Sequence, residues 1–176
     1  MKKNILIYGL IAGALVSGFM LYTMNNLSHC KGSVDYNTSM FIGYASMLIA
    51  FCLVFVGIRN YRNNYNGGII TFGKSFKIGI MIVLIASTIY VVSWLIDYYW
   101  FIPDFAEKYS ANMLNEMRNS GATADEIQKQ SQELESMSTI LNNPFLNALV
   151  TYTEILPIGL VVTVISSLIL KRKSSN

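Results

Sequence analysis

Four apolar runs dominate this chain, and apolar runs of about 20 residues form transmembrane helices. They cover residues 5–24, 39–58, 76–101 and 146–170. Spans of this length consume roughly half of the chain, and only residues 102–145 are long enough between them to be more than a connector. The apolar share of 53% and the charged share of 13% agree with this class. The chain is predicted to be an all-α, polytopic membrane protein with a single four-helix domain over residues 1–176.

Basic and acidic residues alternate from one connection to the next. Nine Lys and Arg residues lie before the first run, between the second and third or at the start of the third, and after the fourth, in segments without Asp or Glu. Because short basic loops stay in the cytoplasm, both termini are predicted to be cytoplasmic. The net charge of +3 gathers at these membrane boundaries. The bilayer, rather than a nucleic acid, is therefore the predicted partner of these charges.

Residues 102–145 contain start and stop signals for two helices, at about 105–119 and 124–141. The signals are two capping boxes and one glycine, namely Asp104 with Glu107, Thr123 with Glu126, and Gly121. Apolar residues at helical spacing give each helix one apolar face. We predict an extracytoplasmic helical hairpin between the third and fourth transmembrane helices. Its apolar seam either closes on itself and on the bundle or forms a Met-rich docking surface for a partner.

Small residues recur at four-residue spacing along two of the runs. They are Gly9, Gly13 and Ser17 in the first run, and Gly159, Thr163 and Ser167 in the fourth. Small side chains allow transmembrane helices to approach closely, so the first and fourth helices are predicted to be neighbours. Homodimerisation through either face uses the same pattern and is the alternative.

Two carboxylates lie inside apolar runs, at similar predicted depths. Asp97 is about one turn, and Glu154 about two turns, inside the outer end of its run. A charge at such depth is costly unless it is paired, hydrated or protonated, which makes both candidate functional residues. Tyr44, Tyr90 and Tyr152 offer hydroxyl partners. The group is either a structural clasp, with Asp97 reaching water and Glu154 kept neutral, or a site that handles protons or a ligand.

Catalytic and metal-binding motifs are missing from the sequence. His29 is the single histidine, which excludes zinc sites that need two histidines. There is also no C-x-x-C, G-x-S-x-G or P-loop motif. We therefore predict no enzymatic activity, no cofactor and no metal site.

Several motifs are spread over nearly the whole chain: the run from Asn66 to Gly79, Pro103-Asp104-Phe105 with Tyr109 after it, Asn143-Pro144, and Glu154-x-x-Pro157-x-Gly159. In these the sequence resembles the bacterial membrane family called domain of unknown function 4199. The resemblance implies a four-helix protein of the bacterial inner membrane with an outer helical insertion and no established activity. Members are often encoded near a polyprenyl-phosphate glycosyltransferase, which implies envelope glycan or lipid-carrier processes.

Two function classes fit this sequence. The first is a non-enzymatic inner-membrane subunit that binds a protein partner, or a second copy of itself, through the hairpin or the small-residue faces. It is favoured by the small size and the lack of catalytic motifs. The second is a proton-coupled, transporter-like or lipid-handling protein that uses Asp97 and Glu154. No internal repeat of the kind common in transporters is visible in the sequence.

The charge pattern makes a testable statement about orientation. A cysteine placed at Ser120 is expected to react with an impermeant thiol reagent in intact spheroplasts, and one at Ser174 is not, because basic segments stay inside. The reverse labelling would contradict the predicted topology.

Overall fold

Six helices make up the part of the chain that the computed structural model describes, residues 1–29 and 36–172. They are α1 (Lys2–His29), α2 (Tyr36–Tyr65), α3 (Phe72–Ile96), α4 (Phe105–Asn119), α5 (Ala124–Leu141) and α6 (Pro144–Leu170). A short π-helical segment, η1 (Asp97–Phe101), continues α3. No β-strand occurs within the described ranges, and the all-α prediction is confirmed.

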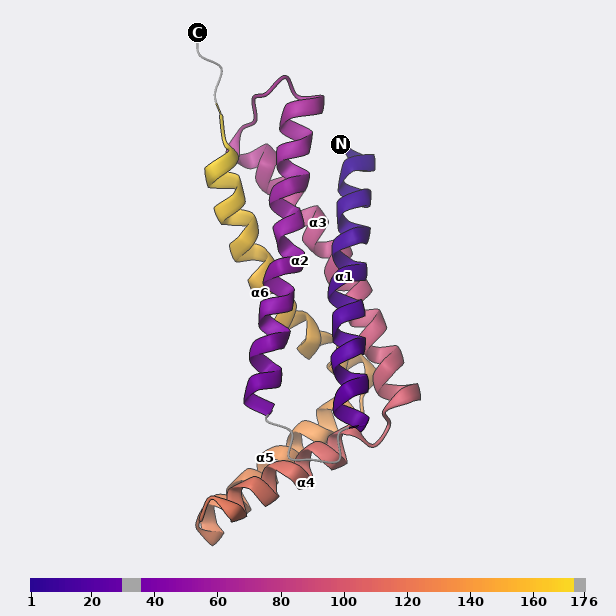
Figure 1. The fold of residues 1–176 in the computed structure, drawn as a ribbon, viewed down its shortest axis with the longest axis vertical. Helices are drawn as coiled ribbons and strands as arrows, with labels where there is room; N and C mark the ends of the chain where they lie inside the picture. Colours follow the sequence, from indigo (N-terminus) through magenta and orange to yellow (C-terminus); the bar gives the residue numbers. More distant parts are fainter. Residues whose placement is uncertain (30–35, 173–176) are drawn as a thin grey trace.

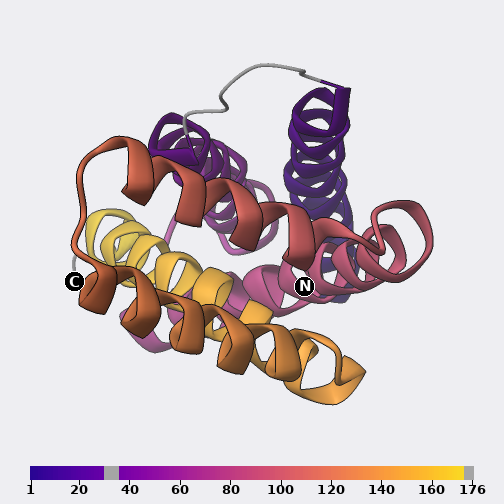
Figure 2. The ribbon, with the colours of Figure 1, turned by 90° about the horizontal axis from the view of Figure 1, so that it is seen from below.

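Four of the described helices are long and apolar enough to cross a membrane, which confirms the predicted number of spans. The apolar segments are Lys2–Asn25, Phe41–Tyr65, Phe72–Phe101 and Pro144–Leu170. Figure 1 shows α1, α2, α3 and α6 along the long axis, with the N-terminus, the α2–α3 connection and the end of α6 at one end. The pair α4 and α5 packs side by side across the opposite end (Figures 1 and 2).

The central helix of the bundle is α3. It packs against α1, α2 and α6, and α2 also contacts both α1 and α6. In contrast, α1 and α6 make no substantial contact with each other. The prediction that the first and fourth spans are neighbours is therefore wrong.

Small residues of α1 face one side of α3. A Cβ atom added at Gly9 would lie 2.8 Å from Cβ of Ile85, and one added at Gly13 would lie 2.7 Å from Cδ1 of Ile89. Ser17 is also buried. The small-residue face of α1 thus brings its backbone against isoleucine side chains of α3.

The small residues of α6 face the other side of α3. A Cβ atom added at Gly79 of α3 would lie 2.6 Å from Cγ2 of Thr163, and Gly159 packs equally closely on Val83. Ser167 is fully buried. Small-residue spacing shows that a face is closely packed but does not specify the partner helix. In this protein both small-residue faces pack against α3.

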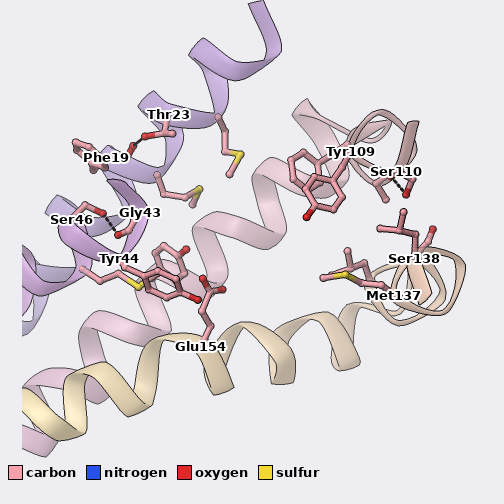
Figure 3. A pocket seen from close by; sticks show the side chains of 18 residues that line it. Phe19, Thr23, Gly43, Tyr44, Ser46, Tyr109, Ser110, Met137, Ser138 and Glu154 are labelled. Carbon is pink, nitrogen blue, oxygen red and sulfur yellow. Dashed lines mark hydrogen bonds between the residues drawn. The ribbon is translucent and has the colours of Figure 1, made fainter. Parts of the chain in front are cut away.

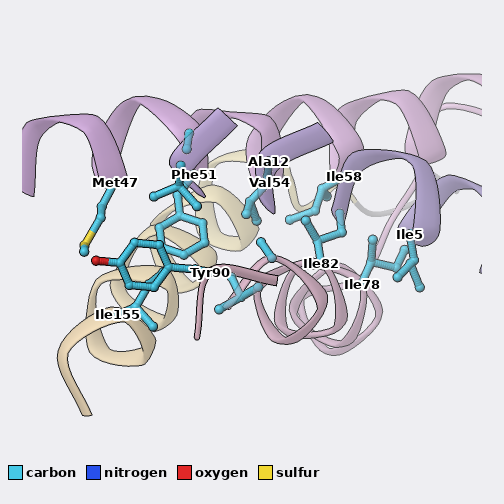
Figure 4. Packing of buried hydrophobic residues seen from close by; sticks show 14 of the residues in the cluster. Ile5, Ala12, Met47, Phe51, Val54, Ile58, Ile78, Ile82, Tyr90 and Ile155 are labelled. Atoms are coloured by element: carbon cyan, nitrogen blue, oxygen red, sulfur yellow. The ribbon is translucent and has the colours of Figure 1, made fainter. Parts of the chain in front are cut away.

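Aliphatic and aromatic side chains fill the space between the bundle helices. Figure 4 shows Ile58 of α2 beside Ile82 of α3, and Ile155 of α6 near Tyr90 of α3. Ile58, Ile82 and Ile155 are each 0% exposed. Close packing of this kind supplies the dispersion energy that holds helices together where lipid offers no hydrophobic drive.

The two ends of the α4–α5 connection follow the predicted signals, whereas the start of α4 does not. The Thr123 backbone N–H donates to the Glu126 carboxylate at 2.8 Å, and this hydrogen bond lowers the pKa of Glu126. Gly121 has a φ of +80°, as expected of a glycine that ends a helix. Asp104 makes no side-chain cap and instead pairs with Lys108 at 2.6 Å, which lowers the pKa of Asp104. The predicted capping box at Asp104 is therefore wrong.

Two glycines of α1 provide a matched test of the contact with α3. Gly13→Leu is expected to lower the free energy of unfolding by about 1–3 kcal/mol, because the larger side chain overpacks a closed interface. Gly18→Leu is the control, since nothing lies within 4 Å of a Cβ at Gly18. Melting curves of the two variants in detergent provide the measurement. Equal destabilisation would show that the Gly13 contact is not specific.

Candidate functional site

A cavity of about 290 Å³ lies between the bundle and the α4–α5 pair, and all six helices contribute to its wall (Figure 3). The bundle contributes Phe19, Met20, Thr23 and Met24 of α1, Gly43, Tyr44, Ser46 and Met47 of α2, Tyr90 of α3 and Glu154 of α6. The other side is formed by Phe105, Ala106, Tyr109 and Ser110 of α4, with Leu134, Met137, Ser138 and Leu141 of α5. The wall is mostly apolar, and Glu154 is its one charged residue among the residues described.

The Glu154 carboxylate lies at the bundle end of the cavity, beside the ring of Tyr44 (Figure 3). Tyr90 is close enough to interact electrostatically with both Glu154 and Tyr44. Glu154 makes no hydrogen bond and no ion pair with any side chain that the structure describes. It lies about 15 Å along α6 from Pro144, where that helix begins. A carboxylate at this depth is costly when charged unless a cation or water reaches it.

Methionines form much of the apolar wall. Met20, Met24, Met47 and Met137 line the cavity from three different helices. A methionine side chain is unbranched and polarizable, so it adapts to apolar ligands of different shapes. The cavity therefore suits a ligand with an apolar body more than one that requires many fixed hydrogen bonds.

The structure brings together three of the five residues in the predicted polar group. Tyr44, Tyr90 and Glu154 line the cavity, and Tyr152 and Asp97 do not. Tyr152 lies two residues before Glu154 and so points to a different face of α6, where its hydroxyl donates to Thr88 at 3.0 Å.

Asp97 occupies the junction between α3 and η1, away from the lining of the cavity. It is 8% exposed, and its Oδ2 atom has no hydrogen-bond partner within the described ranges. It follows Tyr90 by seven residues, which places it about 10 Å further along the helix. The similar depths inferred for Asp97 and Glu154 therefore do not place them in one site.

A buried amide attaches α5 and α6 to α3. The Trp94 Nε1–H donates to Oδ1 of Asn147 at 2.9 Å, and Nδ2 of Asn147 donates to the Leu141 carbonyl at 3.1 Å. The Tyr99 hydroxyl donates to the same carbonyl at 2.7 Å. Asn147 is 0% exposed, so its amide group is shielded from water. They hold the C-terminal end of α5, and with it one wall of the cavity, against the bundle.

Aromatic contacts attach α4 in a similar way. Phe105 packs edge-on against Trp94, with ring centroids 5.6 Å apart, and stacks on Tyr109 at 6.0 Å. Tyr98 packs against both Trp94 and Phe105. Phe105 and Tyr109 also line the cavity, so the same rings fix α4 and form part of the wall.

The sequence analysis did not identify Trp94 and Asn147 as important residues. One signal was present, because Asn147 is a lone amide inside an apolar run and Trp94, unlike Trp100, lies well inside the end of the third run with a polar N–H. Buried polar groups need partners, and pairing these two across the membrane helices would have satisfied both.

The cavity offers one carboxylate to a bound ligand. The two intramembrane carboxylates lie in different places, and only Glu154 faces the cavity. Among the side chains that the structure describes, no group of three His, Cys, Asp or Glu residues is arranged to hold a metal ion. A single carboxylate with two tyrosines is the kind of polar group that can orient a ligand in a mostly apolar site.

Four helices are long and apolar enough to cross a membrane, and α3 is the central one. With a cavity between them and the α4–α5 pair, they define a multi-pass membrane protein. Residues 7–172 match the model of the family described as "Protein of unknown function (DUF4199)", and since this is nearly the whole chain, the protein belongs to that family. The resemblance found in the sequence is thereby confirmed. No curated protein and no solved structure matches the chain.

The buried amide allows a direct test of what holds the cavity wall. Asn147→Ala is expected to lower the free energy of unfolding by about 1–3 kcal/mol, because it leaves the Trp94 Nε1–H buried without an acceptor. Asn142→Ala, at an exposed position five residues earlier, is the control. The two melting curves are compared in detergent. Equal shifts would mean that the Trp94–Asn147 hydrogen bond does not stabilise the fold.

Proposed function

We propose that this protein is a membrane-embedded binding protein for a small amphiphilic molecule, which it holds in the cavity between the bundle and the α4–α5 pair. The observation that carries the proposal is the polarity of the wall. Glu154 and Tyr44 lie at one end, and the apolar side chains of Met137 and Leu141 lie towards α5. Ligand sites commonly combine a mostly apolar wall with a few polar groups that fix orientation.

The volume limits what the cavity accepts. Small-molecule sites span about 300–1,000 Å³, and the cavity volume of about 290 Å³ is at the lower end of that range. A single chain or a compact amphiphile is of the right size, whereas both chains of a membrane lipid are not. The proposal therefore belongs to the lipid-handling class of function rather than to the class of large-substrate transporters.

An accessory-subunit function has weaker support. Gly9, Gly13 and Gly159 pack on α3, so the small-residue faces are used within the chain. Phe105 and Met137, from the predicted apolar seam, line the cavity. The small-residue faces suggested for a protein partner or a second copy are thus used within the chain, and these residues of the apolar seam belong to the proposed ligand site.

We also propose that the cavity faces the outer half of a bacterial inner membrane, with α4 and α5 outside the cytoplasm. The arrangement of basic residues supports this orientation. Lys2 begins α1, Arg62 lies in the last turn of α2 and Arg172 follows α6. These helix ends lie at the end of the bundle opposite the α4–α5 pair (Figure 1). A ligand would then enter from the outer leaflet or from the extracytoplasmic side.

Two alanines of α4 test whether the cavity is the binding site. Ala106 lines the cavity, whereas Ala111 is exposed and does not. Ala106→Trp is expected to weaken binding of tritiated dodecanol and dodecylammonium by about tenfold or more, because the indole occupies the volume that the chain needs. Ala111→Trp is expected to bind both probes like the natural protein. Failure of both probes to bind the natural protein, or equal binding by the two variants, would contradict the proposal.

A further inference from the structure

The geometry points to a lipophilic ammonium ion as the class of molecule that occupies the cavity, with the ammonium group at Glu154 and the apolar chain directed towards α5. This inference rests on the proposed binding function and specifies its ligand. The three observations that carry it are the charge of the wall, the aromatic rings at the charged end, and the apolar surface beyond them.

The charge of the wall selects a cation. Glu154 is the one charged residue in the lining formed by the described helices, and no Lys or Arg among these residues faces it. Lys108 lies on α4 but pairs with Asp104 outside the cavity. An anionic head group would meet only repulsion at Glu154, whereas an ammonium group supplies the missing counterion.

The rings at the charged end favour an ammonium group over a metal cation. Tyr44 lies beside Glu154 (Figure 3), and Tyr90, which also lines the cavity, interacts electrostatically with both. The face of an aromatic ring attracts cations, and ammonium groups are recognised in this way. A metal ion would require several oxygen or nitrogen ligands instead. One carboxylate beside two rings matches the needs of an organic cation.

The remaining wall requires that the cation carry an apolar body. Met137 and Tyr109 both lie at the end of the cavity away from Glu154 (Figure 3). Leu134 and Leu141 complete that side. A small hydrophilic amine would leave this surface unused, so the chain of an amphiphile contributes most of the burial.

Three probes that differ in one feature at a time test the inference. They are dodecylammonium, dodecanol and butylammonium, and their binding is measured on the full-length protein in phosphatidylglycerol nanodiscs, with binding to empty discs subtracted. The natural protein is expected to bind dodecylammonium at least about tenfold more tightly than dodecanol. Butylammonium is expected to bind more than about a hundredfold more weakly than dodecylammonium, because it lacks eight methylene groups.

Glu154→Gln preserves the shape of the side chain and removes its charge. The preference for dodecylammonium over dodecanol is expected to fall to about one in this variant. Glu135→Gln, at an exposed position of α5 outside the cavity, is the matched control and is expected to retain the full preference. Tyr44→Leu removes one ring without touching the carboxylate. It is expected to reduce the preference by about threefold to tenfold, which gives a second test if Glu154→Gln fails to fold.

Three results would overturn the inference: equal binding of dodecylammonium and dodecanol, an unchanged preference in Glu154→Gln, or butylammonium binding as tightly as dodecylammonium. Each is distinguishable from failure of the proposed function. If dodecanol binds and Ala106→Trp blocks it, the cavity is still an amphiphile site, and only the ammonium head group is excluded. If neither dodecyl probe binds, both proposals fail.

Discussion

Close packing of small residues on both sides of α3 is the contact on which the rest of the structure depends. Lipid chains remove the hydrophobic drive between helices, so association relies on dispersion contacts that require close approach. Gly13 of α1 and Gly159 of α6 provide that approach on two different faces of α3. Because α1 and α6 both pack against α3, they do not pack against each other. The cavity is lined by these helices, by α2 and by the α4–α5 pair.

The second constraint is the attachment of α4 and α5 to the end of the bundle. Asn147 links Trp94 of α3 to the last carbonyl of α5, and Phe105 packs on the same tryptophan. Trp94 thus contacts both of the segments that return the chain to the membrane. This attachment places a largely apolar wall opposite the membrane helices, and the cavity lies between the two.

Within that space a lone carboxylate determines the chemistry. Glu154 has no cationic partner among the described residues, and a low-dielectric wall makes such a charge expensive. No contact within the described helices gives this carboxylate a structural partner. The charge is better explained by a ligand that neutralises it, and the tyrosines and methionines around it match an organic cation with an apolar chain.

The sequence alone determined the number of membrane helices, the apolar spacing of α4 and α5, and the cap at Thr123. It also offered Tyr44, Tyr90 and Glu154 among its polar candidates. These features depend on neighbours within one helix turn or on local hydropathy. Tertiary structure decided that α1 and α6 both pack on α3, that Asp97 and Tyr152 lie outside the cavity, and that Asn147 pairs with Trp94. Small-residue spacing and depth in the membrane say which face is closely packed or how deep a group lies. They do not say which helix lies opposite, since that choice follows from the rotation and order of helices around α3.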